Sequence, residues 1–236
     1  MPVLFAVFIV LPAIVLSQTP PQKAVEVSPG FVRFQLLRGE SGTHSVTLFS
    51  NESAPLEVVD VTSPVKWITI KFHKAEAAER IEKGQSGNAQ YRFDISLDGG
   101  VAEVGPIAER IKIKTNSAAS PEVLLGVSGA VRPPYKVDPV SVDFGEVAPS
   151  DVRATRSILV NSNDPKNPTA FNIEKAESTS DMILITIKPG AYKGGFEITL
   201  QMRKEAPRGP FQGTVRIHTN NQYPAIYEVP FKGTVK

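Results

Sequence analysis

The 236-residue chain contains two copies of one series of motifs, and no other feature limits its fold as strongly. The motif at residues 27–34 has Val, Pro, Val and Phe at fixed spacing and recurs 110 positions later at residues 137–144. Three further blocks recur in the same order, residues 68–71 as 185–188, 93–97 as 196–200, and 111–116 as 215–220. The chain is therefore predicted to consist of two similar domains, each of a size that can bury its own core.

The repeated blocks have the pattern of antiparallel β-strands. Ile111 and Ile113 alternate with Lys112 and Lys114, and an apolar residue occupies every second position from 196 to 200. A period of two places one side of a strand in a core and the other in water. Each repeat holds about seven such runs between Gly, Pro and Asn turn signals, as in a β-sandwich. We therefore predict an all-β protein of two tandem Ig-like antiparallel β-sandwich domains.

The two domains are predicted to meet at a pair of prolines, Pro133 and Pro134. Consecutive prolines favour an extended polyproline conformation and stiffen a joint. The first domain is accordingly assigned to residues 24–131 and the second to residues 135–236, arranged as an elongated pair.

The first repeat carries a charged insertion, residues 72–88, that the second repeat lacks. The stretch from Lys71 to Phe93 spans 22 positions, against 8 from Lys188 to Phe196. Helix formers and favourable i,i+4 charge pairs occur in the insertion, so one hypothesis is a short helix that caps the sandwich. A solvated surface loop is the favoured alternative, because an isolated helix of this length is marginal in water.

The chain begins with an uncharged, strongly apolar run at residues 3–16. The run is too short to span a membrane and is typical of the apolar core of a secretory signal peptide. Val15 and Ser17 are small enough to precede a cleavage site, so residues 1–17 are predicted to be a signal peptide removed on export. Retention as a membrane anchor is the alternative, and after cleavage no membrane span is expected.

The composition excludes several classes of protein and site. The chain has no cysteine, which excludes disulfides, thiolate metal sites and cysteine nucleophiles. Its formal net charge of +2 gives no reason to expect a nucleic-acid partner. With 41% hydrophobic residues the chain can bury a core, so an exported protein of this kind would be stabilised by burial and by sheet hydrogen bonds.

The sequence carries no motif that indicates catalysis, cofactor binding or metal binding. The three histidines, His44, His73 and His218, lack the spacing of a metal site. Asp94 and Glu197 occupy equivalent positions in the two repeats, which indicates a structural role rather than an acid–base pair. Neither a G-x-S-x-G motif nor a glycine-rich phosphate loop occurs. We therefore expect no catalytic, cofactor or metal site, and a protein that is not an enzyme.

Aromatic residues near the predicted loops of the second domain are the candidates for a binding surface. Tyr192, Phe211 and Tyr223 would form a modest interaction rim, because tyrosine is favoured at interfaces. Scattered exposed aromatics without a binding role are the competing interpretation. The single tryptophan, Trp67, is expected to pack in a core or at a sheet edge rather than to bind a sugar, because its equivalent in the second repeat is Leu184.

The second repeat opens with V-D-F-G-E-V at residues 142–147, carries a G-x-F block at 209–211, and ends a late strand in Thr219-Asn220. With these motifs it resembles a bacterial Ig-like domain family of unknown function, which is similar to the MSP/ASH/PapD-like group of sandwiches. The first repeat resembles that family only loosely. Many members carry a Cys-Gly-Cys turn that this chain lacks, so no metal or redox role is carried over. The resemblance implies an Ig-like fold and leaves the function open.

These observations lead to three hypotheses of function. The first is a non-enzymatic exported protein that acts as a structural, adhesion or protein-interaction module of the bacterial envelope, with a protein or an envelope polymer as its partner. The second is a PapD-like periplasmic chaperone or assembly factor that binds partner strands at a sheet edge. The third is an envelope hydrolase that uses Glu or His side chains on domain-end loops. Export would place the protein in the periplasm, at the cell surface or outside the cell.

Overall fold

The computed structural model describes residues 23–148, 154–204 and 206–236, so the predicted signal peptide lies outside the described residues. Eight strands form the first half: β1 (Val25–Ser28), β2 (Phe31–Leu37), β3 (Ser41–Ser50), β4 (Val58–Thr62), β5 (Ile68–Lys74), β6 (Tyr91–Asp98), β7 (Gly105–Thr115) and β8 (Glu122–Arg132). The second half contains β9 (Tyr135–Asp138), β10 (Val142–Val147), β11 (Thr155–Ser162), β12 (Ile173–Ser178), β13 (Ile183–Pro189), β14 (Gly195–Met202), β15 (Gly209–Thr219) and β16 (Ile226–Val235).

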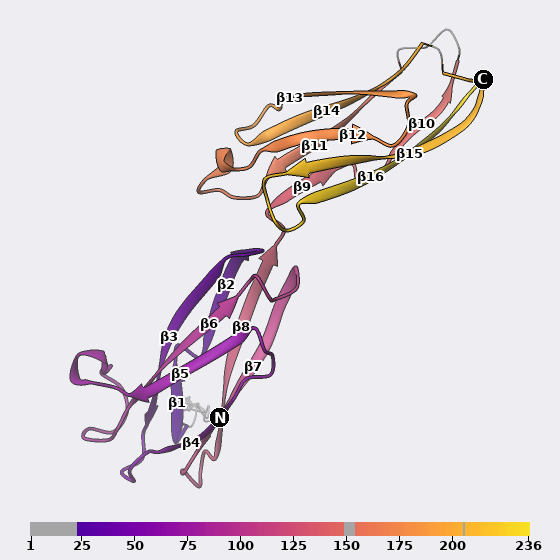
Figure 1. Ribbon diagram of the computed structural model, residues 1–236. Helices are drawn as coiled ribbons and strands as arrows, with labels where there is room; N and C mark the ends of the chain where they lie inside the picture. Colours follow the sequence, from indigo (N-terminus) through magenta and orange to yellow (C-terminus); the bar gives the residue numbers. More distant parts are fainter. Residues whose placement is uncertain (1–22, 149–153, 205) are drawn as a thin grey trace, which may run out of the picture.

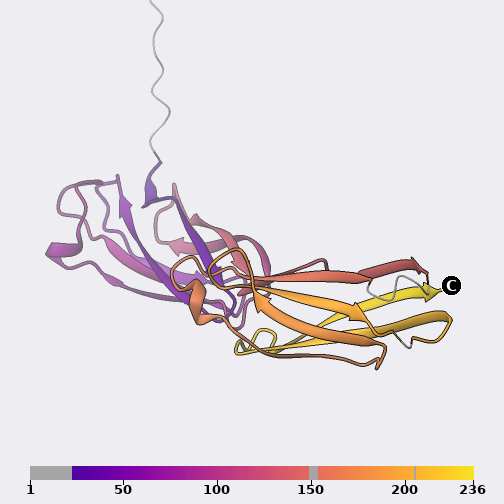
Figure 2. The same ribbon diagram turned by 90° about the horizontal axis from the view of Figure 1, so that it is seen from above.

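These strands build two β-sandwiches that lie end to end (Figure 1). In the first sandwich, one sheet has the order β1-β3-β6-β5 and the other β2-β8-β7-β4. The second sandwich repeats this arrangement with β9-β11-β14-β13 and β10-β16-β15-β12, and its two layers are visible from above (Figure 2). The order is that of an Ig-like domain whose first strand is shared between the sheets. The predicted fold, two tandem Ig-like β-sandwiches, is therefore confirmed.

The first strand of each sandwich crosses from one sheet to the other at a proline. Before the crossing, β1 pairs antiparallel with β3, and after it β2 pairs parallel with β8. The second sandwich does the same, since β9 pairs antiparallel with β11 and β10 pairs parallel with β16. Both crossings contain a cis peptide bond, Ser28–Pro29 and Asp138–Pro139. The first repeated motif of the sequence thus corresponds to this crossing.

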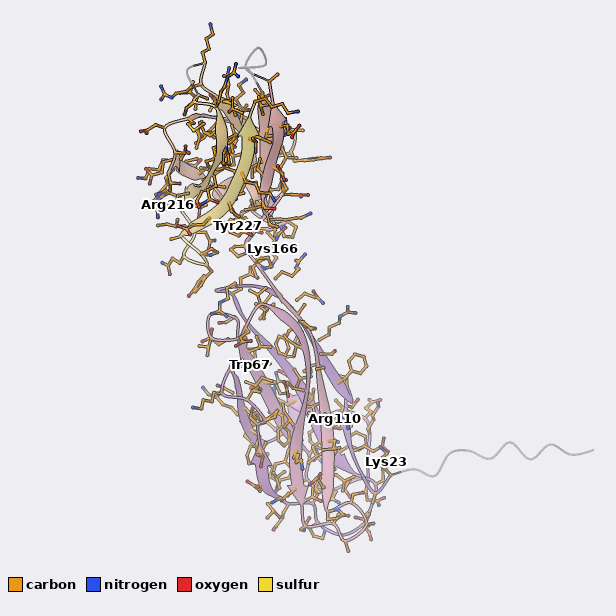
Figure 3. All side chains as sticks on the ribbon, turned by 90° about the vertical axis from the view of Figure 1, so that its right-hand side faces the viewer. Lys23, Trp67, Arg110, Lys166, Arg216 and Tyr227 are labelled. Atoms are coloured by element: carbon orange, nitrogen blue, oxygen red, sulfur yellow. The ribbon has the colours of Figure 1, made fainter. Side chains whose placement is uncertain are left out.

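Each sandwich has a core of its own, built from the inward side chains of both sheets. Phe34 and Ile111 are almost completely buried in the first core, and Phe144 and Ile198 in the second. Burial of such side chains contributes roughly 1.5–3 kcal/mol each to folding. Trp67 is partly buried and packs against the first core, toward the end that faces the second sandwich (Figure 3).

The insertion of the first repeat is a loop with one short 3-10 turn, η1 (Ala77–Glu79), rather than a helix. The i,i+4 pair that the sequence offers between Glu79 and Lys83 is not formed. Glu79 instead contacts His73 of β5, at 2.9 Å, and Arg92 of β6, at 3.6 Å. Contacts with the sheet thus replace the contacts that would have stabilised an isolated helical turn.

Candidate functional site

The structure separates the three aromatic residues of the predicted rim. Phe211 is only 7% exposed, and its ring centroid lies 5.6 Å from that of Phe144 and 6.5 Å from that of Phe231. The prediction that Phe211 belongs to a surface rim is therefore wrong. Its side chain is on the inner face of β15, directly opposite Gly233, and the missing side chain of that glycine leaves room for the ring.

Tyr223 lies at the joint between the sandwiches, in the β15–β16 loop. The guanidinium carbon of Arg38 is 5.3 Å from the centroid of its ring. A Cβ atom on Gly39 would come within 2.8 Å of the same ring, so only glycine allows this approach. Tyr223 is thus engaged by the first sandwich. Of the three predicted residues only Tyr192, in the β13–β14 turn, is widely open to solvent, at 76%.

The linker between the sandwiches is held from both sides. In the first sandwich, the backbone N–H of Arg38 donates to the carbonyl of Arg132 at 2.8 Å. In the second, Asn163 donates from its backbone to Pro134 and from its side chain to Pro133, each at 2.9 Å. These bonds and the Tyr223 contact give the joint a defined geometry, consistent with a stiff proline linker.

The three histidines lie apart from one another. The ring of His44 packs on Phe34, with 4.7 Å between the centroids. His73 pairs with Glu79 in the first sandwich, and His218 pairs with Glu177 in the second, at 3.1 Å. Hydrogen bonds from Lys175 and from His218 lower the pKa of the Glu177 carboxyl. Each histidine therefore has a local packing or pairing partner of its own.

Asp94 and Glu197 have equivalent surroundings in the two sandwiches. Asp94 accepts a hydrogen bond from Ser45, and Glu197 accepts one from Ser157, both at 2.6 Å. The bond from Ser45, together with Arg92, lowers the pKa of Asp94. Each pair joins neighbouring strands on the solvent side of a sheet, which is an arrangement that stabilises strand pairing.

A hollow of about 490 Å³ opens at the end of the first sandwich that lies away from the joint. Its walls are Ser53 and residues 55–57 of the β3–β4 loop, residues 85–89 at the end of the insertion and just after it, and Lys74 and Tyr91. We call this feature the tip hollow. The second sandwich lacks the insertion that forms one of its walls.

A buried glutamine holds the insertion in place. Gln90 is 6% exposed, and its side-chain amide makes three hydrogen bonds of 2.9–3.0 Å with the backbone of Ile81 and Lys83. The amide satisfies donors and acceptors of the loop that would otherwise need water or a partner. One side chain, that of Gln90, therefore fixes the backbone of the insertion at Ile81 and Lys83.

An asparagine joins the insertion to the neighbouring loop. The Asn88 side chain donates to the carbonyls of Glu52 and Ala54, at 3.0 and 2.7 Å, and accepts from the backbone N–H of Leu56 at 3.1 Å. These three hydrogen bonds fix one wall of the hollow against the other. Gln90 and Asn88 had no signal in the sequence beyond the extra length of the insertion.

Glu79 fastens the other side of the insertion to the sheet. Its carboxylate accepts a hydrogen bond from the backbone N–H of Glu76 at 3.0 Å and contacts His73 and Arg92. The backbone bond from Glu76, and then the bond from His73, lower the pKa of Glu79. The carboxylate form therefore favours the observed position of the loop.

The tip hollow presents polar groups of both kinds to a ligand. Lys74 offers a cation and Glu57 an anion, while Gln85 and Ser86 offer an amide and a hydroxyl. Such a set suits a polar ligand recognised by hydrogen bonds, for example a sugar chain or a peptide backbone. Among the described residues no group of three or more potential metal ligands occurs, and no helix is long and apolar enough to cross a membrane.

Comparisons with known proteins give similarity of architecture only. No family model and no curated protein matches the chain. A protein of unknown function from Porphyromonas gingivalis W83 covers 89% of this chain and 99% of its own, at 11% identity and a TM-score of 0.35. Domains 4–9 of the surface layer protein SbsC cover 92% of this chain and 32% of their own, at 15% identity and a TM-score of 0.30. The sialic acid binding region of a Streptococcus sanguinis SK1 adhesin covers 92% and 78%, at 10% identity and a TM-score of 0.29.

Proposed function

We propose that the protein is an exported, non-enzymatic interaction module of the bacterial envelope, and that it binds a protein or an envelope polymer at the tip hollow of its first sandwich. The observation that carries this proposal is the insertion itself. It adds residues to one of two otherwise similar sandwiches and forms one wall of a polar hollow there.

The way the insertion is held supports a binding role. Fixing the backbone of one loop residue costs about 1–2 kcal/mol of conformational entropy. In this loop the side chains of Gln90, Asn88 and Glu79 offset that cost before any ligand arrives. A surface that is already ordered loses less entropy when it binds, so its contacts contribute more to affinity.

In this proposal the second sandwich acts as a spacer. The joint fixes its position through the Arg38–Tyr223 contact and the bonds of Asn163 to the linker. Lys23 lies near the outer end of the first sandwich, and the chain ends at the outer end of the second (Figures 1 and 3). The tip hollow would then be presented at a fixed distance from whatever holds the C-terminal end.

Affinity capture tests the proposal. The chain without residues 1–17 is immobilised through its C-terminal end and exposed to an envelope fraction and to a panel of glycans. We expect one partner that is lost with Lys74→Glu, because that change reverses the charge in the hollow. Lys71→Glu, on the same strand but outside the hollow, should leave binding unchanged. A partner retained equally by both variants, or no partner in either assay, would contradict the proposal.

The hydrolase hypothesis finds less support in the arrangement of the side chains. Ser45 donates its hydroxyl proton to Asp94 and not to a histidine, and His73 faces Glu79. A nucleophilic serine needs a base that takes up its proton, and Asp94 with a lowered pKa is poorly suited to that task.

A further inference from the structure

Strand β13 is an edge strand with an open side. It pairs with β14 alone and is the outermost strand of its sheet (Figure 1). Its residues 183–187 read I-L-I-T-I, the longest uncharged run among the eight edge strands of the described residues. Soluble proteins usually interrupt such edges with charges, bulges or prolines, because a free apolar edge pairs with other strands. An edge without that protection is a surface that another strand can extend.

The hydrogen bonds of the ladder show which groups face outward. The N–H of Gly190 donates to Gly195, and the N–H of Arg203 donates to Met182, both at 2.8 Å. Bonded residues alternate in an antiparallel ladder, so the even-numbered residues of β13 bond to β14. The N–H and C=O groups of Ile185 and Ile187 therefore point to the free edge, as does the C=O of Ile183. The N–H of Ile183 is already bonded to Ser180, at 3.3 Å.

We infer that β13 pairs antiparallel with β13 of a second copy of this chain, about a two-fold axis at Ile185. In this register the N–H of each Ile185 meets the C=O of the other Ile185, and the N–H of each Ile187 meets the C=O of the other Ile183. The occupied N–H of Ile183 is not required. The inference goes beyond the proposed function and does not depend on it.

Side-chain pairing favours the same register. The uncharged run 183–187 lies opposite itself, and Leu184, which is 41% exposed, is covered by Thr186 of the other copy. A shift of the axis to Thr186 would place Lys188 beside Leu184, and a shift to Ile187 would place Pro189, which has no N–H, opposite Ile185. A two-fold interface of this kind uses the same surface on both copies, so assembly stops at two.

Sedimentation equilibrium of the chain without residues 1–17 tests the inference. We expect a monomer–dimer equilibrium that Leu184→Lys/Thr186→Lys weakens at least about tenfold, because two pairs of lysines would face each other across the axis. The matched control is Thr155→Lys/Leu159→Lys, which adds the same charge to the same sheet face on β11, an inner strand that pairs with β14 along its length and with β9 from Leu159 onward. This control should dimerise like the wild type.

A charge swap makes the test specific. Leu184→Glu/Thr186→Glu should also dimerise more weakly than wild type when alone, and it should form a heterodimer when mixed with the lysine variant. Hydrogen exchange of wild type should show the amides of Ile185 and Ile187 becoming more protected as concentration rises, with Thr186 unchanged. A wild type that stays monomeric, a lysine variant that dimerises like wild type, open-ended oligomers, or protection of β13 only by an added foreign strand would each overturn the inference.

Discussion

Strands β5 and β13 occupy the same position in the two sandwiches and differ in what surrounds them. In the first sandwich Lys71 places a charge in the middle of the strand, and Glu79 of the insertion contacts His73 of β5 and Arg92 of β6. In the second, the chain passes from β13 to β14 through a short glycine-containing turn, and the edge stays open. One framework used twice thus gives an edge strand interrupted by Lys71 and a neighbouring hollow in one copy, and an edge strand with the uncharged run 183–187 in the other. The connection after this strand, more than the framework, decides which surface is available.

The pairs of strands that close the two cores differ as well. In the first sandwich Ile107 lies opposite Gly129, and in the second Phe211 lies opposite Gly233. A Cβ on Gly129 would come within 1.8 Å of a backbone oxygen of Phe34, whereas a Cβ on Gly233 would meet the Phe211 ring at 2.6 Å. Equivalent glycines are therefore required for different reasons, one by the backbone and the other by an aromatic side chain.

The largest effect is expected from Phe211→Ala. It should lower the unfolding free energy of the second sandwich by about 3–5 kcal/mol, because it leaves a cavity among Phe144 and Phe231. Tyr192→Ala should change it by less than about 0.5 kcal/mol. Urea unfolding followed by circular dichroism measures both, while fluorescence of Trp67 reports the first sandwich, whose transition should not move. If the Phe211→Ala variant were as stable as the Tyr192→Ala variant, the assignment of Phe211 to the core would be wrong.

The next effect separates the two equivalent glycines. Gly129→Ala should cost about 2–4 kcal/mol, because Gly129 has a φ of 137° and its new methyl group would meet backbone. Gly233→Ala should cost about 1–3 kcal/mol, because its new methyl group would meet the Phe211 ring, which can shift, and the Cβ atom of Phe144 at 2.8 Å. Urea unfolding of each sandwich gives the two values. Adding Phe211→Leu should recover part of the loss for Gly233→Ala only, and recovery in both variants would show that the two sites are packed alike.

The smallest effect is expected from loss of the contacts that Glu79 makes between the insertion and the sheet. Glu79→Gln should speed tryptic cleavage after Arg80 and Lys83 about two- to fivefold, as expected for loss of an exposed ion pair. Glu82→Gln removes the same charge from an exposed neighbour and should have no effect.

The stabilisation of the insertion by Glu79 should depend on pH in one direction. Because the pKa of Glu79 is lowered in the folded chain, its contribution is complete above the ordinary carboxyl range and is lost as pH falls through the lowered value. Hydrogen exchange of the insertion should therefore differ between wild type and Glu79→Gln at neutral pH and converge in acid. A difference that persists in acid would assign the stabilisation to other contacts.

Much of the fold could be predicted because the duplication doubled every local signal. Alternation around Ile111 and Ile113 correctly predicted which side chains of β7 face the core. The same reasoning predicted Asp94 and Glu197 to be equivalent, and the structure gives both a serine partner.

The binding surfaces were harder to predict because they depend on contacts between distant residues. Phe211 has a loop-like sequence context, and its burial follows from a glycine on the neighbouring strand. No local pattern reveals that the Gln90 amide is buried against the insertion or that the half-buried Asn88 amide joins two loops. The open edge of β13 follows only from strand order, which no single segment encodes.

The parallel pairs β2–β8 and β10–β16 determine how the molecule would respond to tension. In each sandwich the entering strand and the departing strand lie side by side and run in the same direction. A pull on the two ends would slide these neighbours past each other, so that all their mutual hydrogen bonds share the force and must break together. Such shear resists extension better than peeling bond by bond, and the continuous β2–β8 register offers more bonds to share the force than the interrupted β10–β16 register.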